Sequence, residues 1–288
     1  MKILVLGGDG MLGHQIVESL RARHEIQATV RSGIGAYSEI AKFLPEAVHY
    51  GIDALGYPAV QRVIESVRPN AVINCLGIVK QRIEAKDSIV SLETNALLPH
   101  RLAGTCAQVG ARLVQPSTDC VFSGRQGNYR ESDFPDADDL YGRSKLLGEV
   151  EGQDCITLRT SIIGLELSRR QGLVEWFLGQ RGTIRGFRKA IYSGFTTLEM
   201  ARIIEHLLES NPQSSGLYHV SSAPIDKYSL LTKLRDRLGR AIQIVPDDDF
   251  VCDRSLDSSR FQAEFAYTPP SWDTMIDEFA SQIEERFA

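Results

Sequence analysis

The chain has 288 residues, of which 43% are hydrophobic and 24% are charged, and its formal net charge at pH 7 is −5. This composition is typical of a globular protein with room for one large domain or two small ones. The slightly acidic balance, without a long basic run, argues against nucleic-acid binding. The first apolar run, residues 3–6, is too short for a signal peptide or a membrane span.

The five cysteines and six histidines are scattered along the chain. An odd number of cysteines without a C-x-x-C motif indicates free thiols in a cytoplasmic protein, rather than a disulfide framework or a zinc site. The histidines form no H-x-x-H or H-E-x-x-H motif, so we expect no catalytic metal.

Up to residue 160, short apolar runs alternate with amphipathic stretches. The predicted strands are residues 2–6, 26–30, 71–76, 112–115 and 155–158. The predicted helices are residues 13–23, 57–67, 88–109 and 140–149. This alternation predicts an α/β fold with a doubly wound parallel sheet of the Rossmann type. Pro99 is expected to kink or restart the helix that contains Asn95.

After residue 160 the pattern becomes less regular. Helices are predicted over residues 197–209, 227–238 and 272–287, the last capped by Ser271, with a strand at 216–220. Residues 1–160 are therefore interpreted as a dinucleotide-binding domain that residues 194–220 complete. Residues 161–193 and 221–288 are expected to form a smaller α/β lobe that binds substrate, with a cleft between the two parts.

A glycine-rich segment follows the first predicted strand and precedes the first helix. It runs Gly7-Gly8-Asp9-Gly10-Met11-Leu12-Gly13, and this position after a strand is the context of a dinucleotide-binding loop. Gly10 allows the backbone to approach a pyrophosphate and Gly13 allows the helix to pack close to the sheet. The amides at the helix N-terminus, including those of Met11 and Leu12, would face the phosphates. A plain glycine-rich turn is the alternative.

The end of the second strand bears on the choice of cofactor. Where an NAD-binding protein would place an acidic residue, this chain has Arg31-Ser32. Arg31 suits a 2′-phosphate and Ser32 can donate a hydrogen bond to it, which favours NADPH over NADH. A solvated surface arginine is the alternative for Arg31. Asp53 is a candidate acceptor for the adenine amino group, or otherwise a surface aspartate.

Tyr141 and Lys145 are four residues apart, so on a helix they share one face. A phenol has a reference pKa of about 10, and a nearby ammonium lowers that value toward the range useful for acid-base catalysis. Lys145 can also hold the nicotinamide ribose. Thr118 follows a buried strand at the carboxyl edge of the sheet, where open α/β sheets bind ligands, and would hydrogen-bond the substrate oxygen. A tyrosine-lysine pair of this spacing also occurs on ordinary surface helices.

These motifs resemble those of the extended short-chain dehydrogenase/reductase superfamily, and within it the dTDP-4-dehydrorhamnose reductase group. The Ser117-Thr118-Asp119-Cys120-Val121-Phe122 run resembles the reductase branch more than the dehydratases, which carry Thr-Asp-Glu at this place. The matching segments, which fall in the family's order, are residues 7–13, 74–77, 94–96, 116–124, 141–148, 158–161 and 255–260.

The resemblance implies hydride transfer from NAD(P)H to the C4 carbonyl of a nucleotide-linked 4-keto-6-deoxy sugar. In this mechanism Tyr141 protonates the alkoxide, Thr118 orients it, and Lys145 tunes Tyr141 and binds the ribose. Asn95 would shape the reacting centre. The cofactor would also be lined by Asn74, Cys75, Leu76 and Gly77.

The resemblance further implies a cytoplasmic enzyme of surface-polysaccharide or related sugar synthesis, and a homodimer. The alternatives are an epimerase or dehydrogenase acting on a related sugar nucleotide, or an NADP-binding regulatory subunit without catalysis.

Residues 77–81 and 185–189 differ from the family's usual sequence, so we expect a different sugar pocket. Arginine suits bidentate contacts to a substrate diphosphate, although any one basic residue is equally a solvated one. The substrate-binding candidates are Val79, Lys80, Ser117, Asp119, Arg188 and Arg254. Phe187, Tyr192 and Trp176 are candidates to stack on a nucleobase, or are core residues.

Overall fold

The computed structural model describes residues 1–287 apart from 38–39, 80–82, 169 and 211–212. At its centre lies a seven-stranded sheet in the order β11-β6-β5-β4-β1-β2-β3, and every adjacent pair is parallel. Its strands are β1 (Lys2–Leu6), β2 (Glu25–Thr29), β3 (Ala47–His49), β4 (Ala71–Asn74), β5 (Arg112–Pro116), β6 (Cys155–Arg159) and β11 (Gly216–His219).

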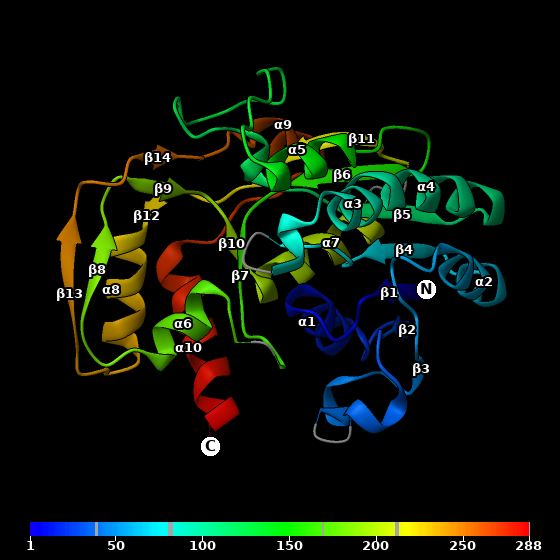
Figure 1. Cartoon of the computed structure of the whole chain (residues 1–288), viewed down its shortest axis with the longest axis horizontal. Helices are drawn as coiled ribbons and strands as arrows, with labels where there is room; N and C mark the ends of the chain where they lie inside the picture. Colours follow the sequence, from blue (N-terminus) through cyan, green and yellow to red (C-terminus); the bar gives the residue numbers. More distant parts are fainter. Residues whose placement is uncertain (38–39, 80–82, 169, 211–212, 288) are drawn as a thin grey trace.

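Helices cover both faces of this sheet (Figure 1). Because successive side chains of a strand point to opposite faces, Ile3 and Val5 of β1 join one hydrophobic cluster, with α1 (Met11–Leu20) and α7 (Thr197–Ser210). Leu4 and Leu6 join the other, with α2 (Tyr57–Val67) and α4 (Leu98–Val109). Burial on both faces explains why the central strands are continuous apolar runs. The fold class expected from the sequence is confirmed.

The long helix predicted over residues 88–109 is divided. It consists of α3 (Ser88–Ser91), a π-helical turn η4 (Leu92–Leu97) and then α4, with Pro99 in the first turn of α4. The predicted restart at Pro99 is therefore confirmed, since proline lacks the amide hydrogen that an uninterrupted helix would use. Helix α5 (Leu140–Leu147) follows later in the chain.

The remaining elements lie beside the sheet. Helix α8 (Lys227–Arg237) packs on a parallel ribbon of β8 (Gly182–Phe187) and β13 (Ile242–Asp247), on the side of the molecule opposite α2 (Figure 1). Two further small sheets pair β10 (Phe195–Thr196) with β7 (Ile162–Ile163), and place β9 (Ala190–Tyr192) between β12 (Ile225–Asp226) and β14 (Cys252–Asp253). The other helices are α6 (Leu173–Gly179), α9 (Ser259–Phe265) and α10 (Trp272–Phe287), with short 3₁₀ turns η1 (Ile34–Tyr37), η2 (Ala41–Phe43), η3 (Ile83–Lys86) and η5 (Asp119–Val121).

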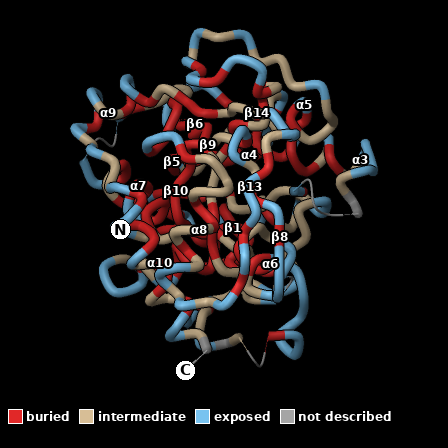
Figure 2. The backbone as a smooth tube through the Cα atoms, turned by 90° about the vertical axis from the view of Figure 1, so that its left-hand side faces the viewer, coloured by how far each residue is buried: buried red, intermediate tan, exposed pale blue. Residues whose placement is uncertain are grey.

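Buried residues are concentrated in the interior of the molecule, between the sheet and its helices (Figure 2). Strand β11 joins the edge of the large sheet beside β6, and Ser271 caps α10, as expected, by accepting from the amide of Thr274 at 3.1 Å. The assignment of residues 161–193 and 221–288 to a substrate lobe stays a prediction. Within the described residues, no helix combines the length and apolarity that crossing a bilayer requires. All five cysteines are free thiols.

Candidate active site

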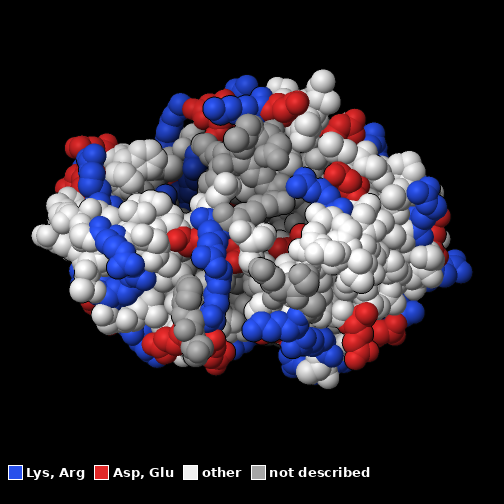
Figure 3. Space-filling view, turned by 60° about the horizontal axis from the view of Figure 1, so that its bottom comes forward, with Lys and Arg blue, Asp and Glu red and all other residues white. Residues whose placement is uncertain are grey.

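A cleft of about 820 Å³ opens at the carboxyl ends of the parallel strands. One wall comes from the loops that follow β1, β2, β4 and β5 and from α5. The other wall comes from β9 and from residues such as Lys227 and Phe250. A hollow with basic side chains beside it is visible on one face of the molecule (Figure 3). A cleft in this position is where open α/β sheets bind their ligands.

The glycine-rich segment forms the floor of one end of the cleft, where Gly7, Gly10, Met11 and Leu12 line it. Gly10 is the N-cap of α1, and no side chain caps the helix there. The first amides of α1 therefore have no side-chain acceptor, which suits a bound phosphate. Gly13 does not line the cleft; it lies one turn into α1, against the backbone of Gly7.

The loop after β2 provides a basic group at the same end of the cleft. Arg31 lines the cleft and is exposed. Ser32 does not line it; its amide donates to the Tyr37 hydroxyl at 3.0 Å, and that hydroxyl donates to the Asp9 carboxylate at 3.0 Å. Asp53 also lines the cleft, and its carboxylate accepts from the amide of Leu55 at 2.9 Å.

The segment after β4 lines the middle of the cleft through Asn74, Cys75, Leu76 and Gly77. Asn74 is fixed because its amide donates to Gln115 Oε1 at 2.8 Å, while its Oδ1 accepts from the amide of Leu76 at 3.2 Å.

Asn95 does not reach the lining of the cleft. Its side chain accepts from the amide of Ile78 at 2.9 Å and donates to the carbonyl of Ile78 at 3.0 Å and to the hydroxyl of Ser144 at 3.2 Å. Asn95 thus ties the loop after β4 to α5 and supports the wall of the cleft from behind. Asn95 was expected to shape the reacting centre through its helix and to contribute to cofactor binding, and both roles stay predictions.

Thr118, Tyr141 and Lys145 meet in the cleft. Asp139 caps α5 by accepting from the amide of Gly142 at 2.8 Å. A Cβ atom at residue 142 would lie 2.2 Å from the Cys120 carbonyl oxygen, so only glycine allows α5 to begin this close to η5. This contact places Tyr141 beside Thr118, and the Thr118 hydroxyl is close enough to favour the phenolate form of Tyr141.

The pKa of Tyr141 is raised, whereas the sequence predicted that Lys145 would lower it. Burial raises the pKa of the phenol, and the neighbouring Cys120 raises it further, while the hydrogen bond with Thr118 opposes the change. The Lys145 Nζ donates instead to the Pro116 carbonyl at 2.8 Å, and the net shift of the Tyr141 pKa is upward. Tyr141 is therefore a protonated phenol at neutral pH, the form that a proton donor requires.

Lys145 is itself perturbed. Burial lowers its pKa to about 8, while the carboxylate of Glu149 and the thiol of Cys75 favour the ammonium. The same residue thus changes protonation close to neutral pH and lies next to the reacting centre.

Among the substrate candidates, Val79, Ser117, Asp119 and Arg254 line the cleft. Burial raises the pKa of Asp119, opposed first by the Arg254 guanidinium. Arg188 does not line the cleft; it forms a surface ion pair with Asp248, with Nε to Oδ1 at 2.9 Å, so the predicted diphosphate contact lacks support. Lys80 lies outside the described residues.

Several lining residues had no motif by which the sequence could identify them, among them Gly164, Glu166 and Lys227. Of the three aromatic candidates, only Tyr192 lines the cleft, and its buried hydroxyl has no hydrogen-bond partner among the described residues. Phe187 packs instead on Phe250, which lines the cleft, with ring centroids 5.4 Å apart. Trp176 is outside the lining.

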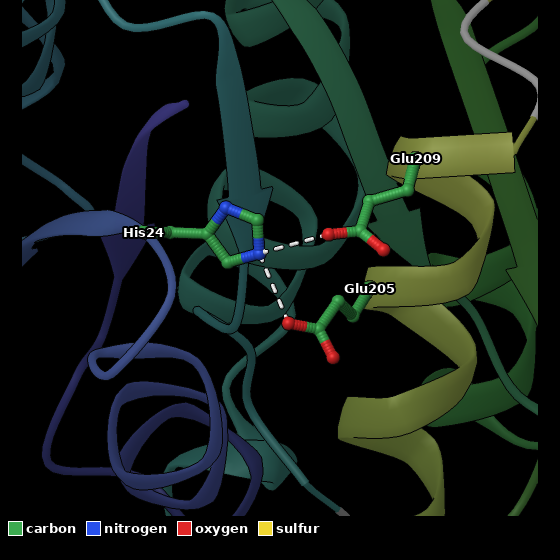
Figure 4. A group of neighbouring side chains, drawn as sticks. All are labelled: His24, Glu205 and Glu209. Carbon is green, nitrogen blue, oxygen red and sulfur yellow. Dashed lines mark hydrogen bonds and ion pairs between the residues drawn. The ribbon is translucent and has the colours of Figure 1, made fainter.

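His24 faces two carboxylates away from the cleft. Glu205 and Glu209 project from α7 toward its ring, with Nε2 2.9 Å from Glu205 and 3.5 Å from Glu209 (Figure 4). The spacing of these ligand atoms, all within 4.8 Å, is compatible with a metal ion. Arg23 also pairs with Glu205, however, so we interpret the group as an ion-pair network that joins the loop after α1 to α7. The expected absence of a catalytic metal stays a prediction.

A sequence model of the RmlD substrate-binding domain family matches residues 1–285 of the chain. Among curated proteins, a dTDP-4-dehydrorhamnose reductase from Burkholderia thailandensis is 29% identical over 167 residues, which are 56% of this chain and 50% of that protein. Methionine adenosyltransferase 2 subunit beta from Bos taurus is 25% identical over 150 residues, 51% of this chain and 41% of that protein. The chain thus matches about half the length of these relatives, or less.

The fold is that of solved structures over nearly its whole length. A dTDP-4-dehydrorhamnose reductase from Bacillus anthracis, in complex with NADP, superposes with a TM-score of 0.79 and 21% identity. The alignment covers 98% of this chain and 99% of that one.

Proposed function

Since the chain belongs to the RmlD substrate-binding domain family, we propose that it is an NADPH-dependent reductase of the C4 keto group of a nucleotide-activated 4-keto-6-deoxy sugar. NADH is the second choice of cofactor. The proposed setting is surface-polysaccharide or related sugar synthesis in the cytoplasm, with a homodimer as the expected assembly.

One observation carries the proposal. A single cleft contains the glycine-rich loop with Arg31 at one end, and Thr118, Tyr141 and Lys145 beside the segment after β4. The residues fit a dinucleotide for two reasons. The N-terminus of α1 has no side-chain cap, and Gly13 leaves room for the helix to pack against the carbonyl of Gly7, where a Cβ atom would collide. Arg31 is the residue that would hold a 2′-phosphate.

The chemistry then divides between cofactor and protein. The bound dinucleotide supplies the hydride. Tyr141 donates its phenolic proton to the C4 oxygen as negative charge develops there, and burial keeps that proton in place beforehand. The Thr118 hydroxyl, held by the amide of Cys120 at 3.1 Å, orients the same oxygen. Lys145, in its ammonium form, would bind the nicotinamide ribose.

The test is oxidation of NADPH, followed by absorbance, against a panel of nucleotide 4-keto-6-deoxy sugars freshly prepared with their dehydratases. We expect turnover with one nucleotide series, and NMR of the product then assigns the configuration at C4. Solvent deuterium at C5 of the product would indicate an epimerase instead. Failure of every sugar, with NADPH binding confirmed by fluorescence, would refute the proposal.

A second candidate is supported by the similarity to methionine adenosyltransferase 2 subunit beta. In that case the chain would bind NADP and a catalytic partner protein, and the cleft would serve binding alone. A stoichiometric partner in purification, together with no NADPH oxidation, would favour this function. Turnover by the isolated chain would exclude it, because a binding subunit has no need of a proton donor.

A further inference from the structure

A buried ion pair lies directly behind the reacting centre. Glu149, just after α5, accepts two hydrogen bonds from Arg159 at the end of β6, at 2.8 and 2.7 Å. The two side chains are 6% and 5% exposed. Bidentate geometry of this kind fixes both groups, and each charge is compensated first by the other.

The carboxylate of Glu149 accepts a third hydrogen bond, from a second residue. The Ser117 hydroxyl donates to Glu149 Oε1 at 2.7 Å, and Ser117 precedes Thr118 on the wall of the cleft. Lys145, one helical turn before Glu149, donates to the carbonyl of Pro116 at 2.8 Å. Two consecutive residues before Thr118 are therefore held from the same end of α5.

Arg159 is fixed on its far side as well. Its Nη1 lies 3.2 Å from His219 Nε2, while His219 Nδ1 lies 2.9 Å from the Tyr129 carbonyl. Since a carbonyl only accepts, Nδ1 carries the hydrogen and Nε2 accepts from Arg159, which describes a neutral ring. The guanidinium also lies over Phe122, 5.2 Å from the ring centroid. Arg159 thus has little freedom to leave Glu149.

We propose that Glu149 is a positioning residue, whose carboxylate, fixed by Arg159, holds the Ser117–Thr118 segment in place and lies beside the Lys145 ammonium, since the two side chains bond the consecutive residues Ser117 and Pro116. The proposal rests on the proposed function for its catalytic consequence. The link between Glu149 and Lys145 can be measured without that reaction. This positioning role gives a reason for a buried ion pair at this place, since such pairs seldom improve stability over well-packed apolar residues.

The charge of Glu149 has a direct effect on its neighbour. Burial alone would drive Lys145 further toward the neutral amine, and Glu149 is the first of the groups that oppose this. When the carboxylate is replaced by an amide, the ammonium loses this attraction and the pKa of Lys145 falls below about 8. The hydrogen bond from Ser117 can survive, because glutamine keeps an acceptor oxygen at the same position.

The experiment compares wild type with Glu149→Gln and with a matched control, Glu199→Gln. Glu199 is also a buried carboxylate, bonded to Arg202 at 3.1 Å and to the Tyr267 hydroxyl at 2.7 Å, and it lies outside the cleft lining. The rate at which acetic anhydride acetylates Lys145 is measured by mass spectrometry as a function of pH. The pH at which this rate is half-maximal, the acetylation midpoint, reports the pKa of Lys145. We expect the acetylation midpoint to fall by about one pH unit in Glu149→Gln and to stay unchanged in Glu199→Gln.

The second readout is the pH profile of kcat with the sugar that the wild type reduces. Because Lys145 must be protonated, the alkaline limb of the profile should move to lower pH in Glu149→Gln by the same amount as the acetylation midpoint. The KM for NADPH at pH 6, where the ammonium persists, should change little. Should Glu149→Gln fail to fold, the double variant Glu149→Gln/Arg159→Gln removes both buried charges, and a smaller shift in the same direction is expected because the opposing charge of Arg159 is lost too.

The outcomes separate this inference from the proposed function. The role of Glu149 is overturned if the acetylation midpoint of Lys145 in Glu149→Gln, or in the double variant, equals that of wild type. This holds whatever sugar is reduced. A shifted midpoint with no reduction of any sugar by wild type supports the coupling and refutes the proposed reaction. A shifted midpoint with an unmoved alkaline limb overturns the catalytic part of the inference.

Discussion

Replacing Gly13 by alanine tests the dinucleotide loop, because Gly13 is the position at which the structure has least space. A Cβ atom there would lie 2.1 Å from the carbonyl oxygen of Gly7 and 3.1 Å from the Cα of Gly8. Contacts below 3.0 Å essentially do not occur, and both groups belong to backbone that cannot rotate away. The turn between β1 and α1 must therefore open.

The magnitude follows from two opposing effects. Alanine in a helix is favoured over glycine by about 1 kcal/mol. Overpacking against a fixed neighbour costs about 1–3 kcal/mol or more, and here it separates the loop from the helix that would bind the pyrophosphate. We expect Gly13→Ala to be less stable than wild type by about 1–2 kcal/mol, and to bind NADPH at least about tenfold more weakly.

Gly104 provides the matched control, since it is an exposed glycine within α4 with nothing within 4 Å of its added Cβ. Gly104→Ala should raise the free energy of unfolding by about 0.5–1 kcal/mol and leave NADPH affinity unchanged. Urea unfolding gives the stabilities, and quenching of tryptophan fluorescence gives the affinities. If Gly13→Ala were as stable as Gly104→Ala and bound NADPH normally, the close packing of the loop on α1 would be refuted.

Three further predictions concern single side chains. Arg31→Ala should weaken NADPH binding by about 10- to 100-fold, as expected for loss of a charge-assisted contact, without changing NADH binding; equal losses for both would remove the 2′-phosphate role. Tyr192→Phe should leave the ligand-free stability unchanged or raised by up to about 1 kcal/mol, because the buried hydroxyl has no partner in the described part of the chain; a clear loss in urea unfolding would contradict this. Burial lowers the pKa of His14 and His219 below 6.5, so the unfolded state binds protons first and stability should fall as pH drops below about 6.5. Urea unfolding at pH 7 and pH 5.5 should show this loss of stability, and the loss should be smaller in His219→Gln. A free energy of unfolding that does not change with pH would argue against neutral buried imidazole rings.

The sheet could be predicted because its strands are buried on both faces. A central parallel strand such as β4 is buried at every position and apolar in all but its last residue, Asn74, and this pattern differs clearly from that of the helices between strands. The small strands of the second half gave no such signal. Strand β12 has two residues, and β8 alternates buried and exposed positions around Gly186, so neither has the length of apolar sequence that distinguishes a strand.

The proximity of the candidate catalytic residues could be predicted from motifs, since Tyr141 and Lys145 share a helix face by spacing alone. Their electrostatics could not. The pKa of Tyr141 is raised and not lowered, because burial and the neighbouring Cys120 dominate it, and the hydrogen bond of Lys145 goes to the carbonyl of Pro116 on another segment. Arg159 and Glu149 likewise meet only through the packing of α5 beside β6, and no local pattern indicates such a pair.

The most direct test of the central claim is the comparison of wild type and Tyr141→Phe in NADPH oxidation with a dTDP-linked 4-keto-6-deoxy sugar, together with their NADPH dissociation constants. The account predicts that kcat falls by at least about 100-fold, since the proton donor is lost, while the affinity for NADPH stays the same. Undiminished turnover by Tyr141→Phe would contradict the account.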